Sequence, residues 1–199
     1  MPSLWPMQWP EMRPLTRLSV LVLAAAVAVA AVGASTAGAS SVTVTANVSA
    51  GSLSLSTSAT PSVSVTLDGT DHTPTYTVPL TVSDNTGSGS GWNITITSTT
   101  FTTGGGSPQT LSTNASTTTG VTATCNGGAT CTAPTNSIGY PVAVPAGASP
   151  PTAAKLFNAA AGTGMGGLTV TPTIQVSIPA NAYAGTYTST LTVAIVSGP

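Results

Sequence analysis

The stretch PLTVSDNTGSGSGWNITIT, from Pro79 to Thr97, indicates the fold of this chain more clearly than any other. Apolar and hydroxyl residues alternate on both sides of a Gly/Ser-rich turn. Alternation with a period of two residues is typical of a half-buried β-strand. Trp92 opens the second strand, and it is the only tryptophan in residues 40–199. Its large ring is therefore predicted to pack in the core of a sheet.

The same alternation recurs along the chain and predicts several more short strands. They are expected near residues 42–48, 53–55, 63–67, 76–82, 121–125, 142–144, 168–178 and 187–195. Asp68-Gly69 predicts a hairpin turn, and Pro79 predicts a break in its strand. Residues 98–120 are rich in Thr, Ser and Gly and predict a long loop with a weak strand near 109–111. Many short strands with Gly-rich turns predict an all-β fold, an antiparallel β-sandwich.

One short helix is expected near residues 152–161. Thr152 can cap it, Ala153 to Leu156 are good helix formers, and Gly162 is placed to end it. The glycine-rich stretch that follows has no lysine after it, so it does not predict a phosphate-binding loop.

The N-terminal 39 residues are predicted to be an export signal peptide. Arg13 and Arg17 precede an apolar stretch over residues 18–32, and Ala37-Gly38-Ala39 forms a small-residue cleavage site. The apolar stretch is shorter than the roughly 20 residues that a spanning helix needs, which disfavours a membrane anchor. We therefore expect one domain over residues 40–199, with cleavage after Ala39 and no membrane association after cleavage.

Charge is almost absent from residues 40–199. Lys155 stands against Asp68, Asp71 and Asp84, which gives a net charge of −2. Such a surface has no basic patch with which to attract nucleic acid or anionic lipid. The sequence thus predicts neither of these partners.

Cys125 and Cys131 are the only cysteines, and they flank a short loop that contains Gly127-Gly128. In an exported chain this pattern predicts a disulfide across a hairpin tip. A metal or redox pair is the alternative, but no partner histidine lies nearby and the spacing is not Cys-x-x-Cys.

No arrangement of residues predicts catalysis. His72 is the only histidine, it lies in a turn, and no Gly-x-Ser-x-Gly motif is present. Asp68, Asp71 and Asp84 leave a calcium site open as an alternative, although turn formation explains all three. We expect a non-enzymatic protein without a cofactor or a bound metal.

Residues 73–199 resemble the WxL domain of Gram-positive cell surfaces. The likeness rests on the stretch around Trp92, on NAAAGTGMGG from Asn158 and on YAGTYTSTLTVAIVSGP from Tyr183. The family carries two Trp-x-Leu motifs. The first corresponds here to Trp92, Asn93 and Ile94, and the second to Val193, Ala194 and Ile195, where the aromatic residue is missing.

The resemblance implies a secreted, cell-wall-associated protein that binds peptidoglycan, another wall glycan or other surface proteins without a covalent bond. It also implies that the six motif residues contact the wall. Trp92 has two interpretations, as a core residue or as part of a sugar-stacking surface. Two alternatives to wall binding stay open: an adhesin that recognises host sugars, and a pilin-like or coat-like subunit that polymerises by strand exchange through Ser40 to Val48.

Overall fold

The computed structural model describes residues 40–128 and 130–199, so the predicted signal peptide lies outside the described residues. The chain divides into two units, residues 1–45 and residues 46–199. Residues 40–45 have no secondary structure, and their valines are exposed. The second unit forms the sandwich.

Six strands make the first sheet, in the order β1-β3-β9-β5-β6, with β2 also paired to β9. All of its pairings are antiparallel. The bounds are β1 Leu53–Ser56, β2 Thr75–Thr77, β3 Leu80–Asp84, β5 Ser116–Cys125, β6 Val142–Ala143 and β9 Gly166–Val176. Pro79 separates β2 from β3, as predicted, because proline cannot donate a ladder hydrogen bond.

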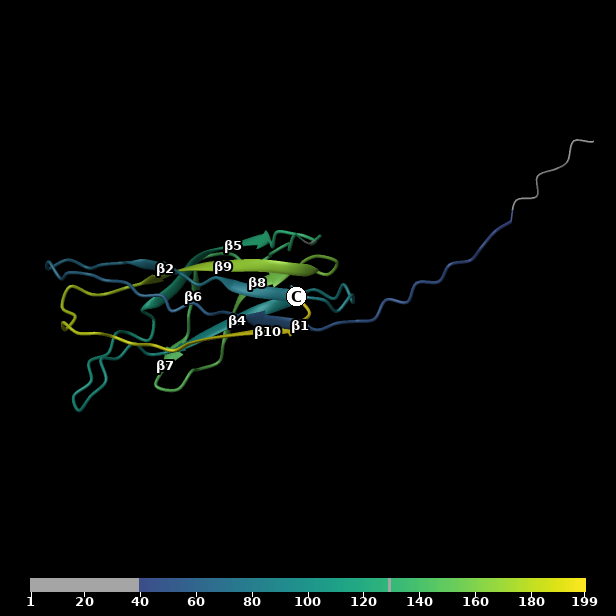
Figure 1. The fold of residues 1–199 in the computed structure, drawn as a ribbon. Helices are drawn as coiled ribbons and strands as arrows, with labels where there is room; N and C mark the ends of the chain where they lie inside the picture. The colour runs from purple at the N-terminus through teal and green to yellow at the C-terminus, as the bar shows by residue number, and fades with distance from the viewer. Residues whose placement is uncertain (1–39, 129) are drawn as a thin grey trace, which may run out of the picture. The chain divides into compact units, whose positions relative to one another are not determined.

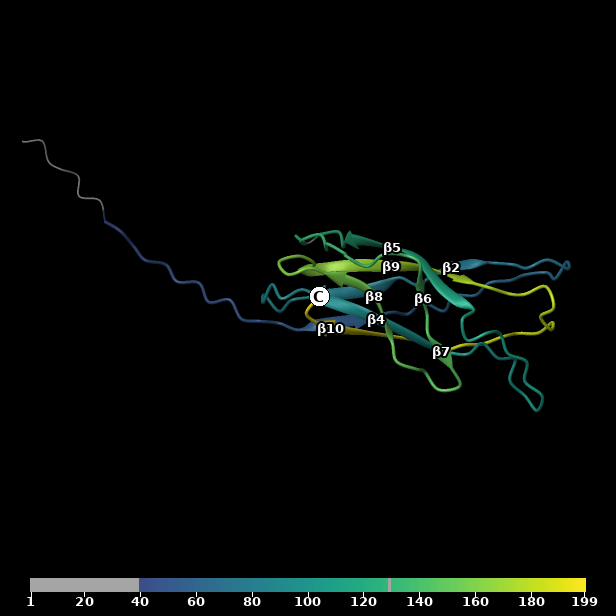
Figure 2. The ribbon, with the colours of Figure 1, turned by 180° about the vertical axis from the view of Figure 1, so that it is seen from behind.

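Four strands make the second sheet, in the order β10-β4-β7, with β8 also paired to β4. Its members are β4 Trp92–Thr99, β7 Ala146–Gly147, β8 Ala154–Ala159 and β10 Leu191–Ser197. β4 pairs antiparallel with β10 and β8 and parallel with the short β7. Figures 1 and 2 show the domain from opposite sides, with β5 and β9 along one side and β4 and β10 along the other.

The core lies between the two layers and confirms the predicted sandwich. Alternate residues of β3, β4 and β9 are buried in one cluster, together with three residues of β8. The fully buried side chains include Leu80, Val82, Trp92, Ile94, Ile96, Leu156, Leu168, Val170 and Ile174. Trp92 is a core residue, as one of the two interpretations of the sequence predicted.

The helix predicted over residues 152–161 is wrong. Residues 154–159 form β8, and none of the described residues is helical. The register of β8 against β4 shifts between Ile94 and Thr95, which is a β-bulge. The bulge buries both Leu156 and Phe157, so the apolar residues lose their two-residue period. A run of good helix formers without alternation indicates a helix. In the structure, however, the segment pairs as a strand with the edge of β4.

Two predicted strands are also absent. Residues 42–48 and 63–67 are extended but pair with no neighbouring strand in the described part of the chain. The loop predicted over 98–120 is shorter than expected, because β4 runs to Thr99 and β5 begins at Ser116. The weak strand near 109–111 is reduced to an isolated bridge between Thr102 and Thr110.

Candidate functional site

The two motif positions lie side by side on neighbouring strands. β4 carries the first motif, β10 carries the second, and the two strands run antiparallel with Ile94 opposite Ile195. Ile96 lies opposite Val193 in the same ladder. Residues about one hundred positions apart in the sequence therefore form one continuous patch of sheet.

Alternation divides the six motif residues between the two faces of that sheet. Trp92 and Ile94 are fully buried, and Val193 and Ile195 pack against the same core. Ala194 is exposed on the outer face. Of the six predicted contact residues, only Asn93 and Ala194 are thus on the outward side of the sheet.

The indole of Trp92 is held from several sides. Its Nε1 donates a hydrogen bond to the carbonyl oxygen of Gly164 at 2.9 Å, and its ring lies 5.8 Å from the ring of Phe157. Gly164 has a left-handed backbone with φ of 73°, and a Cβ atom there would lie 2.9 Å from Nε1. The glycine-rich stretch after β8 therefore has a packing role, which the sequence alone did not reveal.

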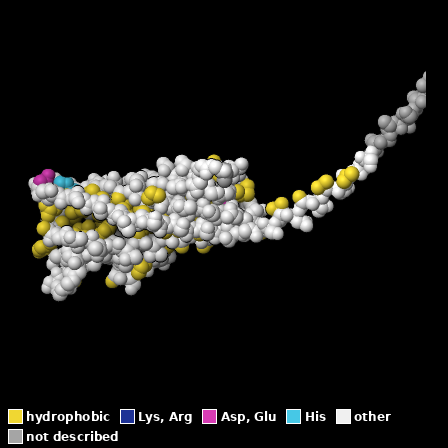
Figure 3. All heavy atoms as spheres, viewed as in Figure 1, with side chains coloured by type: hydrophobic (Ala, Val, Ile, Leu, Met, Phe, Trp, Pro, Cys, Tyr) yellow, Lys and Arg dark blue, Asp and Glu magenta, His cyan; other side chains and the backbone are white. Residues whose placement is uncertain are grey.

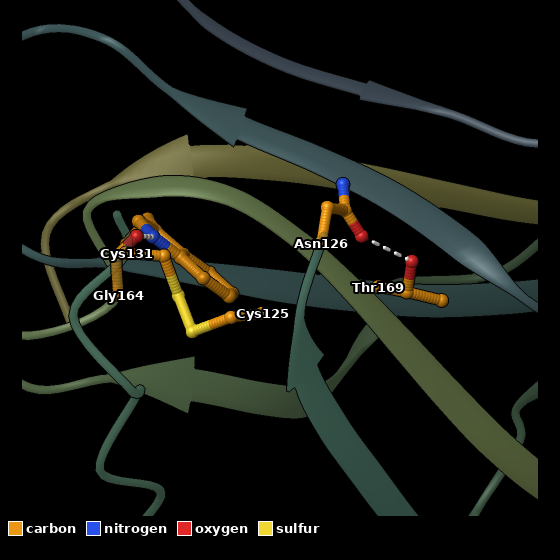
Figure 4. Close-up of a disulfide and its surroundings, with 6 residues drawn as sticks. Cys125, Asn126, Cys131, Gly164 and Thr169 are labelled. Atoms are coloured by element: carbon orange, nitrogen blue, oxygen red, sulfur yellow. Dashed lines mark hydrogen bonds between the residues drawn. A yellow bond between two sulfur atoms is a disulfide. The ribbon is translucent and has the colours of Figure 1, made fainter. Parts of the chain in front are cut away.

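The predicted disulfide between Cys125 and Cys131 is present, with the two Cα atoms 5.8 Å apart (Figure 4). Beside it, Thr169 donates a hydrogen bond to the side-chain oxygen of Asn126 at 2.7 Å. The segment after Cys131 also bonds to the glycine-rich stretch, since the Gly164 amide donates to the carbonyl of Thr132. The disulfide loop and the stretch that contacts Trp92 thus form one connected structure.

On the outer face of the second sheet, Ala194, Thr95 and Lys155 form a row across β10, β4 and β8. Loops cover this face on both sides of the row. At one side Thr97 donates to the carbonyl of Pro151 at 3.0 Å, and at the other Ser137 donates to the side chain of Asn158. The row between them stays open, next to the exposed Thr192 and Val196.

Asn93 lies beside this row and has one unused hydrogen-bonding atom. Its side-chain nitrogen donates to the carbonyl of Gly198 at 2.8 Å. Its side-chain oxygen is buried and has no hydrogen-bond partner among the described residues. Buried polar atoms usually have a partner, so this oxygen is an exception, and its burial keeps it from direct contact with a ligand on the outer face.

A hollow of 1030 Å³ opens near the other end of the strands, between the segment 57–67 and the segment 182–191. Its walls are mainly apolar, and Figure 3 shows hydrophobic side chains gathered in it. Among the lining residues are Val63, Val65, Leu67, Tyr76, Tyr183 and Tyr187. The alternation from Val63 to Leu67 predicted a strand and gave no sign of a hollow.

Asp68 and Asp71 lie in one turn after residue 67, and Asp84 is the last residue of β3. Asp68 accepts hydrogen bonds from Thr70, and Asp84 does the same with Thr86. Asp71 accepts a bond from the amide of Ala180 at 2.8 Å. These bonds correspond to the turn-forming interpretation of the sequence. Within the described residues, no group of three potential metal ligands is brought together.

His72 lies 3.1 Å from the carboxylate of Asp68. The hydrogen bonds from Thr70, and then the nearby His72, hold the pKa of Asp68 below its ordinary value. No helix in the described ranges has the length and hydropathy to cross a membrane.

These features define a disulfide-bonded β-sandwich domain with an almost uncharged surface. The family model described as WxL domain, surface cell wall-binding, matches residues 30–199. The chain belongs to this family, which confirms the resemblance seen in the sequence. Comparison with curated proteins and comparison with solved structures each gave no significant match. Membership in the family places the protein at the cell surface, in association with the wall.

Proposed function

We propose that this protein is a non-catalytic surface protein held on the Gram-positive cell wall by non-covalent contacts to peptidoglycan or another wall glycan. The contact surface is the open row of Ala194, Thr95 and Lys155, together with the neighbouring Thr192 and Val196. The observation that carries the proposal is the match of residues 30–199 to a family of wall-binding surface domains.

The arrangement of the two motifs supports this surface. The inward residues of both motifs pack in the core, so they contribute to wall binding by holding β4 and β10 in register. Asn93 and Ala194, which alternate with the inward motif residues, face outward and are uncharged. Hydroxyl groups and small apolar side chains suit the hydroxyl and amide groups of a glycan, which need hydrogen bonds and close contact rather than charge.

Lys155 adds the only positive charge of residues 40–199 to this row. Its ammonium donates to the carbonyl of Pro199 at 3.0 Å, and it is exposed. One exposed lysine contributes little to binding in physiological salt. We therefore propose that retention on the wall depends only weakly on ionic strength.

A pull-down with isolated Gram-positive sacculi tests the proposal. The mature chain is incubated with sacculi at low and high salt, and bound and free protein are compared. We expect measurable retention at both salt concentrations. Ala194→Asp should reduce it, because a carboxylate placed in the row would lose hydration against the glycan. Lys155→Gln should change it by less.

Ala143→Asp is the matched control, since Ala143 is an exposed alanine on β6 in the other sheet. It should bind sacculi as well as the unmodified chain. Circular dichroism of each variant shows whether the fold is kept. Equal retention of folded Ala194→Asp and Ala143→Asp would place the wall contact elsewhere on the protein.

A further inference from the structure

One long segment of the sandwich domain has the sequence of a strand but lacks a partner. Residues 60–67 follow β1 and alternate apolar and hydroxyl side chains, with Val63, Val65 and Leu67 lining the hollow. No backbone hydrogen bond of these residues occurs within the described part of the chain. An extended segment with unpaired amide and carbonyl groups is a template for pairing with another strand.

The hollow beside this segment exposes apolar surface. Val63 is 36% exposed and Leu67 is 38% exposed, and Tyr183 on the opposite wall is 67% exposed. Figure 3 shows the hydrophobic side chains between the two segments that border the hollow. Exposed apolar surface of this kind commonly marks a binding site, and here it lies directly beside unpaired backbone.

A second unpaired strand sequence lies near the predicted mature N-terminus. Val42, Val44, Ala46 and Val48 alternate with polar residues. Val42, Val44 and Val48 are 83%, 86% and 94% exposed, and this segment also forms no strand. Its apolar side chains recur every second residue, which is the spacing of the three apolar residues along 63–67.

We infer that residues 42–48 of one copy insert as a β-strand into the hollow of a second copy, and that they pair there with residues 60–67. Each insertion pairs backbone groups along one edge of both segments and buries the apolar side chains of both. Because donor and acceptor are different surfaces, the contact is heterologous and generates head-to-tail chains of copies.

Chain length disfavours insertion within one molecule. The two segments flank β1, and residues 60–67 continue from β1 toward the far end of the sandwich (Figure 1). At about 3.3 Å per residue, the chain between Val42 and Leu53 spans roughly 36 Å, and the chain from Leu53 to Val63 spans roughly 33 Å. If the chain before Leu53 folded back along β1, only Val42 would reach the start of residues 63–67. The rest of residues 42–48 would be too close to β1 to pair with that segment.

Charge does not oppose the association. Neither residues 42–48 nor residues 60–67 contain a charged side chain. The nearest charges in sequence are Asp68 and Asp71, which lie in the turn beyond the acceptor segment and bond to neighbouring residues. Strand addition in this hollow therefore brings no like charges together.

Sedimentation of the purified mature chain, residues 40–199, tests the inference. We expect a weight-average mass that rises with protein concentration beyond that of a dimer. Val44→Lys should weaken the association by roughly tenfold or more, because the ammonium would be buried without a partner. Thr43→Lys is the matched control, since its side chain lies on the opposite face of the same strand, and it should associate normally.

Cysteine cross-linking tests the pairing itself. A Val44→Cys chain is mixed with chains that carry Val63→Cys, Val65→Cys or Leu67→Cys, and each mixture is oxidised mildly. We expect covalent dimers in at least one mixture, and none with Ser54→Cys on the outer face of β1. A monomeric product from a chain with both Val44→Cys and Val65→Cys would show insertion within one molecule and would overturn the inference.

A mature chain that stays monomeric at all concentrations, with no cross-linked dimer in any mixture, would also overturn it. Chains that are disrupted equally by Val44→Lys and Thr43→Lys would mean that another surface holds the copies together. Wall binding is tested separately, because Val44→Lys leaves the outer face of β4 and β10 intact. That variant should keep its retention on sacculi even where it no longer associates.

Discussion

The indole of Trp92 donates a hydrogen bond to the carbonyl of Gly164, a residue 72 positions later, at 2.9 Å inside the core. This bond joins the start of β4 to the glycine-rich stretch between β8 and β9. Since β4 pairs with β10 and β8, the position of Trp92 affects both of its neighbours in the second sheet. The tryptophan of the first motif thus supports the sheet that carries the proposed wall contact.

Gly164→Ala should destabilise the protein more than Gly162→Ala. Both glycines have left-handed backbones, with φ of 73° and 77°, so each substitution carries a backbone cost of about 1 kcal/mol. Only at residue 164 does the added Cβ also collide with Trp92, because the space around Gly162 is open. Urea unfolding followed by tryptophan fluorescence measures the difference, and equal losses would contradict this packing role.

Trp92→Ala should cost about 3–5 kcal/mol, a large share of the stability of a domain of this size. Trp92→Phe should cost less, because it keeps most of the contact with Phe157 and leaves only the Gly164 carbonyl without its donor. Near-ultraviolet and far-ultraviolet circular dichroism report the fold of each variant. A stable, folded Trp92→Ala domain that fails to bind sacculi would mean that Trp92 supports wall binding beyond its contribution to stability.

The central strands could be predicted from the sequence because each buries one face. β3, β4 and β9 place apolar residues at every second position, so the pattern identifies both the strand and its inward side. β8 could not be predicted, because the bulge opposite Ile94 and Thr95 buries two successive residues and removes that period. Its good helix formers therefore indicated a helix, because the pairing with β4 is a tertiary contact that the sequence does not show.

The candidate surface could be predicted only in part. Both motif positions were identified, but their pairing across β4 and β10 depends on sheet order, which alternation does not specify. The same limit explains why the hollow could not be predicted. Residues 63–67 have a strand pattern, yet a pattern cannot show that no neighbour in the same chain provides the other half of the ladder.

Removal of the disulfide should have a modest effect on stability. Cys125 and Cys131 close a loop with a sequence separation of 6, which corresponds to about 2 kcal/mol on the chain-entropy estimate. We expect Cys125→Ser with Cys131→Ser to fold, with a lower urea midpoint and altered fluorescence of Trp92, because the loop after Cys131 bonds to Gly164. An unfolded double variant would show that the bridge holds the whole domain together.

Alkaline pH should destabilise the sandwich through Tyr76. Burial at the wall of the hollow raises the pKa of its phenol above the ordinary value of about 10. The folded state then holds the phenol proton more tightly than the unfolded state, so the free energy of unfolding is unaffected below pH 10 and falls as the pH rises above it.

Tyr76→Phe should reduce this decline. Urea midpoints between pH 8 and about 11.5 measure it, with the exposed Tyr183→Phe as the control. Identical slopes for Tyr76→Phe and the unmodified chain would show that Tyr76 is not the group responsible.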